Sequence, residues 1–138
     1  MGGIPYKAVV VCDPNEAEAT ALKSAVVESL DRVNDLMSTY KPDSDVSRFN
    51  RSESTDWIEV DAETAAVVAR AIEISKQTDG AFDITVGPAV NAWKFGPDKS
   101  EFKQPTEEQI AQLQMTVGYQ RLAVRSTQPG LKLSLIHI

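Results

Sequence analysis

Two polar segments of this sequence contain the side chains best suited to hold a small molecule. The first, MSTYKPDSDVSRFNR, covers residues 37–51, lies between two predicted helices and shows no hydrophobic periodicity. Tyr40 offers a flat ring with a polar tip, which can stack on a heteroaromatic ligand. Asp43 and Ser44 can form turns by bonding to their own backbone, and Arg48 can tie the loop to a carboxylate. The segment is therefore either an ordered surface loop or one wall of a binding site.

The second segment, TDGAFDITVGP, covers residues 78–88. Its first glycine would let the backbone approach a ligand closely. Asp83 lies on the polar face of a predicted strand, where a carboxylate can accept hydrogen bonds from a ribose hydroxyl or an exocyclic amine. The alternative is a helix–strand junction with a solvent-facing carboxylate, and the residues alone leave both interpretations open.

The elements before the first segment are a strand and a long helix. Residues 6–12, YKAVVVC, are β-branched and apolar, which predicts a buried strand. Asp13 is a suitable N-cap, with Pro14 at the first helical position and Glu16 completing a capping box. The apolar stripe of the helix that follows consists of Leu22, Val26, Leu30, Val33 and Met37.

The rest of the chain predicts short strands mixed with helices. Because the strands do not alternate regularly with the helices, an α+β fold is favoured over a doubly wound sheet. The predicted elements are a strand at residues 57–60, a helix from Asp61 to about Thr78, a strand at residues 81–86, a helical turn with Trp93 and Phe95, a helix capped by Thr106 and Gln109, and a hairpin of residues 121–126 and 131–138 around a Pro-Gly turn.

Composition excludes several classes of function. The 138 residues include 20 acidic and 14 basic side chains, giving a net charge of −6, and no basic stripe that would favour nucleic acid. No apolar run approaches the roughly 20 residues of a membrane span. Cys12 and His137 are each the one residue of their kind, which argues against a disulfide, a cysteine metal cluster or a Ser-His-Asp triad. Phosphate-loop, dinucleotide and zinc signatures are absent.

The segments MSTYKPDSDVSRFN and TDGAFDITVGPAVNAW resemble the two N-terminal motifs of the ApbE-type flavin transferases, the FAD:protein FMN transferases. The interval between them and the early PYKAVVV run are similar as well, so the resemblance extends from about Gly3 to Leu135. It implies an ApbE-like α/β fold, placed under α+β, in which residues 1–138 are the N-terminal portion of a single flavin transferase domain.

The resemblance implies an activity and a location. Family members bind FAD and a divalent metal, usually magnesium, and transfer FMN to a threonine hydroxyl of a target flavoprotein, releasing AMP. Targets include subunits of membrane-bound, ion-translocating oxidoreductases. Many members are exported lipoproteins, which implies that the full-length protein is lipid-anchored at the periplasmic face of the inner membrane. This chain shows no signal peptide.

The resemblance also implies roles for individual residues. Tyr40 matches the family tyrosine that lies against the flavin nucleotide, and Ala81, Phe82 and Asp83 match a segment that lines the FAD site. Whether Met1 or Gly2 takes the place of a family methionine is open. No catalytic residue and no metal ligand is assigned.

One departure from the family pattern limits the expected activity. The sequence stops before the family's lysine-containing AKGYAVD-type segment and before the later aspartate and threonine that hold the metal. Pyrophosphate chemistry needs a metal and cationic groups to neutralise charge, and a net charge of −6 would repel the nucleotide. We therefore expect an incomplete chain that does not transfer FMN alone, or alternatively a non-catalytic FAD-binding module or an inert structural fragment.

Overall fold

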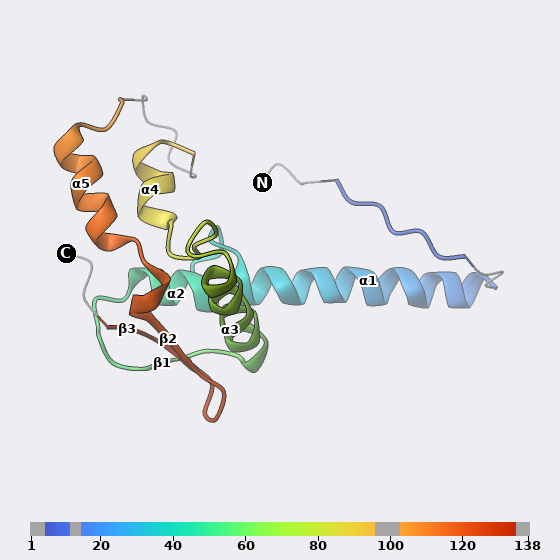
Figure 1. The fold of residues 1–138 in the computed structure, drawn as a ribbon. Coiled ribbons are helices and arrows are strands. Elements are labelled where there is room, and N and C mark those ends of the chain that lie inside the picture. Colours follow the sequence, from blue (N-terminus) through green and yellow to red (C-terminus); the bar gives the residue numbers. More distant parts are fainter. Residues whose placement is uncertain (1–4, 12–14, 96–102, 135–138) are drawn as a thin grey trace. The chain divides into compact units, whose positions relative to one another are not determined.

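A computed structural model describes residues 5–11, 15–95 and 103–134, in two compact units, Met1–Ser47 and Arg48–Ile138. The combination of helices with a small antiparallel sheet agrees with the predicted α+β class. In chain order the elements are α1 (Glu16–Met37), α2 (Asp45–Arg51), β1 (Ile58–Glu59), α3 (Ala62–Gln77), α4 (Gly87–Ala92), α5 (Glu107–Thr116), the 3-10 turn η1 (Tyr119–Arg121), β2 (Leu122–Arg125) and β3 (Gly130–Leu133) (Figure 1). In the described ranges, no helix is both long and apolar enough to cross a membrane.

Helix α1 forms as predicted, but its N-cap is different. The side chain of Asn15 accepts a hydrogen bond from the N–H of Glu18, and the Glu18 carboxylate accepts from the N–H of Asn15, both at 3.0 Å. The predicted capping box of Asp13 and Glu16 is therefore wrong; Asp13 itself lies outside the described residues. Asparagine and aspartate are about equally good caps, so sequence preference alone did not separate them.

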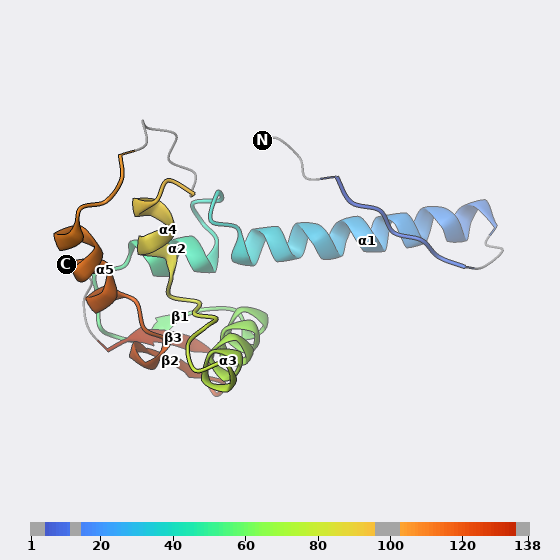
Figure 2. The same ribbon diagram turned by 45° about the horizontal axis from the view of Figure 1, so that its top comes forward.

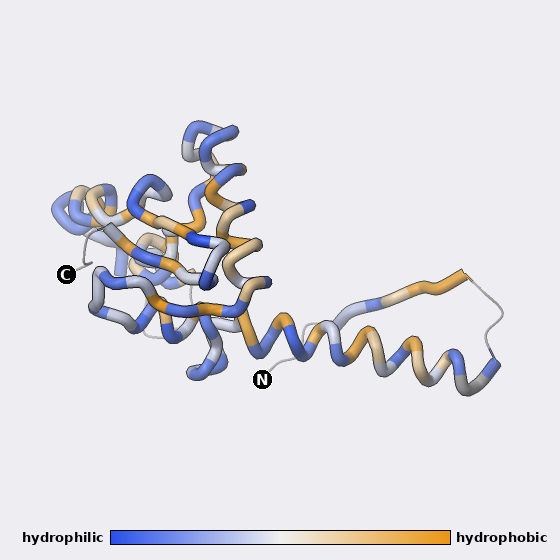
Figure 3. Tube along the Cα trace, turned by 90° about the horizontal axis from the view of Figure 1, so that it is seen from below, coloured by the Kyte–Doolittle hydropathy of each residue, from blue (hydrophilic) through white to orange (hydrophobic). Residues whose placement is uncertain are grey.

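The predicted strand at residues 6–12 is not formed over residues 5–11, and Cys12 lies outside the described residues. The end of this stretch is apolar and orange in Figure 3, but the side chains of residues 5–11 are exposed. A strand requires a hydrogen-bonded neighbouring strand. In the described part of the first unit, the regular elements are α1 and the start of α2, both helices. Apolar composition therefore predicted a strand where the described residues pair no strand with this stretch.

Residues 45–51, the second half of the predicted loop, form helix α2. The hydroxyl of Ser44 accepts a hydrogen bond from the N–H of Ser47 at 3.0 Å, which is the geometry of an N-cap. The prediction of an irregular segment is therefore wrong for this half. The helix is short enough that it shows no hydrophobic period.

The second unit contains a three-stranded antiparallel sheet in the order β1-β3-β2. Leu131 of the central strand pairs with Ile58 on one side and with Val124 on the other. The predicted strand at residues 57–60 and the predicted hairpin are thus confirmed, except that residues 135–138 lie outside the described residues.

Helix α3 lies beside this sheet and supplies much of the core, as Figure 2 shows. Asp61 is its N-cap, as predicted, accepting from the N–H of Glu63 at 2.9 Å. Leu131, exposed by 2%, lies at the centre of the core. The other buried members of this cluster are Val60, Ala65, Val68, Ile72 and Leu122.

The predicted strand at residues 81–86 is wrong, because this stretch consists of bends and turns before α4. Asp79 and Gly80 both have positive φ angles, of 49° and 80°, which direct the chain away from an extended path. Asp83 then folds back on Thr85 in a local turn. The alternation of Phe82, Ile84 and Val86 is therefore not the signature of a strand here.

Helices α4 and α5 confirm the predicted helical turn and third helix. Thr106 and Gln109 form the predicted capping box, with bonds of 3.2 and 2.9 Å. The two helices contact each other. Between them lies an apolar hollow of about 220 Å³, lined by Val86, Ala89, Trp93, Ile110, Leu113, Gln114 and Val117.

Candidate functional site

Tyr40 lies in a turn between α1 and α2 that is built by serine hydroxyls. The carbonyl oxygen of Ser38 accepts hydrogen bonds from the hydroxyl of Ser44 at 2.7 Å and from the hydroxyl of Ser47 at 3.2 Å. Ser44 and Ser47 are buried, with exposed fractions of 1% and 7%, so water competes little for these bonds. The first segment is therefore an ordered turn rather than a mobile linker.

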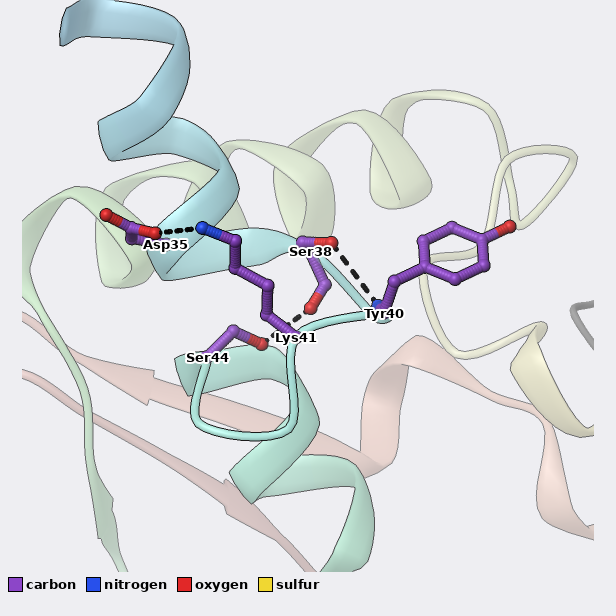
Figure 4. Close-up of polar contacts among 5 residues, drawn as sticks. All are labelled: Asp35, Ser38, Tyr40, Lys41 and Ser44. Atoms are coloured by element: carbon purple, nitrogen blue, oxygen red, sulfur yellow. Dashed lines mark hydrogen bonds and ion pairs between the residues drawn. The ribbon is translucent and has the colours of Figure 1, made fainter. Parts of the chain in front are cut away.

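The ring of Tyr40 is directed away from the polar groups that hold the turn (Figure 4). Its N–H donates to the hydroxyl of Ser38 at 3.3 Å, whereas 66% of the residue is exposed. The backbone is thus fixed while the ring face is accessible, which is the arrangement that stacking on a planar ligand requires. The predicted FAD contact of Tyr40 stays a prediction.

Lys41 ties the same turn to the last turns of α1. Its ammonium group forms a hydrogen bond and an ion pair with the carboxylate of Asp35 (Figure 4). That hydrogen bond raises the pKa of Lys41 above its ordinary value of 10.5, with a further contribution from the charges of Asp35 and Asp31. The lysine beside Tyr40 is therefore held in its charged form by two carboxylates of α1.

The Ala81–Phe82–Asp83 segment lies in the second unit and begins three residues after Thr78, the C-cap of α3. The carbonyl of Thr78 accepts from the N–H of Ala81 at 3.0 Å, and the hydroxyl of Thr78 accepts from the N–H of Phe82 at 3.2 Å. The side chains of Ala81 and Phe82 are both exposed, that of Phe82 with an exposed fraction of 45%. Thr78 thus fixes the backbone while the two side chains remain accessible to a ligand.

The carboxylate of Asp83 binds the protein's own backbone. One oxygen accepts from the N–H and the hydroxyl of Thr85, at 2.8 and 2.7 Å, and the other accepts from the N–H of Tyr119 at 2.9 Å. The hydroxyl of Thr85 in turn accepts from the N–H of Gly118 at 2.7 Å. Asp83 is half-buried and joins its loop to the start of η1, so the alternative of a solvent-facing carboxylate does not hold.

Sequence reasoning missed Thr85, Gly118 and Tyr119, which complete this network. The spacing of an aspartate and a threonine two residues apart was a usable signal, since both types form local side-chain turns. The contacts with residues 118 and 119, more than 30 positions later, cannot be predicted from the residues around Asp83. Tyr40 belongs to the first unit and residues 81–83 to the second.

The other predicted site residues have partial outcomes. A guanidinium nitrogen of Arg48 donates to the main-chain carbonyl of Glu59 at 3.2 Å, and the expected contact of Arg48 with a carboxylate stays a prediction. Met1 and Gly2 lie outside the described residues. Among the residues that are described, no three His, Cys, Asp or Glu side chains gather in a way that could hold a metal ion, so no metal ligand is assigned.

Comparison with known proteins places this geometry in a family. The profile of the ApbE family matches residues 3–137. The FAD:protein FMN transferase of Haemophilus influenzae is 48% identical over 103 residues, covering 74% of this chain and 30% of that protein.

Two solved structures are also similar. The flavin transferase ApbE from Vibrio cholerae has a TM-score of 0.81 and 35% identity, covering 91% of this chain and 40% of that one. The flavinyl transferase ApbE from Pseudomonas stutzeri has a TM-score of 0.78 and 30% identity, covering 85% and 38%.

The chain spans about a third of the length of the curated relatives it matches, 30% of the Haemophilus influenzae protein and 36% of a Vibrio cholerae one. Within that span the agreement is continuous, since the family profile extends over nearly every residue and includes both polar segments. Sequence profile, relatives and backbone agree, and this chain belongs to the ApbE family.

Proposed function

We propose that this protein acts as a FAD:protein FMN transferase, moving FMN from FAD to a threonine hydroxyl of a target flavoprotein. The observation that carries the proposal is the family match over residues 3–137, together with relatives of that activity at up to 48% identity. In the reaction, the threonine oxygen forms a bond to the FMN phosphorus, the pyrophosphate bond breaks, the hydroxyl proton is lost and AMP leaves.

Four residues are proposed to contact FAD. Tyr40 would stack on a planar ring of the nucleotide, which its exposure of 66% allows. Ala81 and Phe82 would pack against FAD through side chains that the Thr78 contacts leave exposed. Asp83 would add a hydrogen-bond acceptor, since each carboxylate oxygen can accept more than one bond.

Magnesium is proposed as the partner of FAD in the reaction. A divalent cation would neutralise the pyrophosphate and stabilise charge on the transferred group. The described residues form no group that could hold it, so no step is assigned to a metal ligand of this chain. The chain's net charge of −6 would repel an anionic nucleotide, and a bound cation would offset this repulsion.

A location is proposed from the same family resemblance. We expect the full-length protein to work at the periplasmic face of the inner membrane, held there by a lipid, with subunits of ion-translocating oxidoreductases as targets. Cell fractionation with an antibody against this chain tests the location. Recovery in the cytosolic fraction alone would contradict it.

FAD binding is the first experimental test. Titration of FAD fluorescence with the chain should show saturable binding. Tyr40→Ala should weaken it by about 1–3 kcal/mol, or roughly five- to 150-fold in Kd, if the ring stacks on the nucleotide. Tyr40→Phe is the matched control, because it keeps the ring and should retain most of the affinity. Equal affinity for the alanine variant and the parent would remove Tyr40 from the site.

Transfer is tested separately, by mass spectrometry of a threonine-containing acceptor subunit incubated with FAD and magnesium. For these 138 residues alone we expect FAD binding without transfer, because the pyrophosphate must be neutralised and the chain carries a net negative charge. An FMN mass on the acceptor threonine, with AMP released, would show that these residues perform the transfer themselves.

A further inference from the structure

We propose that Thr85 is a positioning residue of the FAD site, which holds the 81–83 segment in its binding shape without touching the nucleotide. The inference rests on the proposed FAD binding by that segment. Thr85 is half-buried, and its hydroxyl has two protein partners at 2.7 Å, as a donor to the carboxylate of Asp83 and as an acceptor from the N–H of Gly118.

The first step of the argument is that the segment is anchored at both ends. At its start, the carbonyl and hydroxyl of Thr78 hold the N–H groups of Ala81 and Phe82. At its end, the carboxylate of Asp83 binds the N–H of Tyr119 at 2.9 Å. Between these anchors the side chains of residues 81 and 82 are exposed. The position of their backbone therefore depends on the anchoring hydrogen bonds.

The second step is that the far anchor rests on a rigid part of the unit. Residues 118 and 119 follow α5 directly, and the ring of Tyr119 packs against the hydrophobic core. The same ring lies beside Gly80, where an added Cβ would be 3.8 Å from it. The hydrogen-bond network therefore fixes the position of residues 81–83 relative to the core.

The third step is that the Thr85 hydroxyl makes the network continuous. It donates to the same Asp83 oxygen that accepts from its own N–H, so it orients the carboxylate. The Thr85 hydroxyl also accepts from the N–H of Gly118. The next residue, Tyr119, donates its N–H to the carboxylate of Asp83. Without the hydroxyl, Asp83 would lose one of the three donors that orient its carboxylate, and the N–H of Gly118 would lose its acceptor.

The test compares the FAD affinity of variants under conditions where urea unfolding shows each to be folded. Thr85→Val keeps the shape of the side chain and removes both bonds of the hydroxyl. It should raise the Kd for FAD by about tenfold, on the scale of the net contribution of a protein hydrogen bond. Thr85→Ser restores the hydroxyl and should bind within about twofold of the parent. Thr116→Val is the matched control, because the hydroxyl of Thr116 donates to the Leu113 carbonyl within its own helix, at 2.9 Å.

Three outcomes would overturn the inference. Unchanged affinity of the Thr85→Val protein, in the presence of FAD binding by the parent, would show that Thr85 has no positioning role. Failure of the parent to bind FAD would overturn the proposed function and this inference together. If Thr85→Val does not fold, amide exchange of the parent decides: FAD should slow exchange at Gly118 and Tyr119, and identical rates with and without FAD would refute the proposal.

Discussion

Replacement of Asp83 by asparagine tests the carboxylate network most directly. The two oxygens of Asp83 accept three hydrogen bonds, at 2.7, 2.8 and 2.9 Å, from Thr85 and Tyr119. An asparagine has one oxygen, so in either orientation its amide group faces a donor. One or two of the three hydrogen bonds are then replaced by a donor–donor contact. The remaining bonds have a neutral acceptor in place of a charged one.

The expected loss of unfolding free energy follows from these bonds. Hydrogen bonds to a charged group contribute about 1.5–3 kcal/mol each, and Asp83 is half-buried, so we expect Asp83→Asn to destabilise the second unit by about 2 kcal/mol. With a urea m-value of about 1–3 kcal/mol per molar, the midpoint should fall by about 1 M. Trp57 and Trp93 both belong to this unit, and their fluorescence reports its unfolding.

The matched control is Asp79→Asn, which makes the same chemical change four residues earlier. Asp79 is exposed and has a φ of 49°, a conformation that asparagine adopts readily, so its midpoint should stay close to that of the parent. If the two variants show equal midpoints, the carboxylate of Asp83 does not brace the loop and the reasoning is wrong.

Two further predictions concern the core and the Tyr40 turn. Leu131→Ala should lower the free energy of unfolding by about 2–5 kcal/mol, because the residue is exposed by 2% at the centre of the sheet; urea unfolding measures this, and a loss below about 1 kcal/mol would contradict the assigned core. The pKa of Lys41 is raised in the folded protein, so its ion pair with Asp35 stabilises the turn fully below the ordinary lysine pKa of 10.5 and is lost as pH rises through the folded value. An NMR titration of the Lys41 side chain should show the raised pKa return toward 10.5 in Asp35→Asn; the same titration curve in both proteins would exclude the pair.

Local patterns predicted the elements whose own residues determine them. Asp61 caps α3 and Thr106 caps α5 through bonds that span two or three positions, so a single sequence shows them. The helix predicted from Asp61 to about Thr78 likewise forms, as α3. The Pro-Gly turn between two alternating runs predicted the β2–β3 hairpin.

The errors arose where distant groups or competing caps decide the structure. The alternation at residues 81–86 predicted a strand, but bonds from Asp83 to Tyr119 and from Thr85 to Gly118 hold the stretch as a turn. Residues 5–11 have strand composition and no strand partner among the described residues. The candidate site was predicted through its motif, whereas the network that braces it depends on a contact that no local pattern contains.

The serine-built turn around Tyr40 has a consequence for the effect of temperature. Among the described residues of the first unit, those that are buried are Ser44, Asp45 and Ser47, all polar, whereas the second unit buries an apolar core. Exposure of apolar surface raises the heat capacity of unfolding and exposure of polar surface lowers it. Unfolding of the turn should therefore cause only a small change in heat capacity. Cooling weakens hydrophobic stabilisation, so it should destabilise the sheet before it destabilises the turn that contains Tyr40.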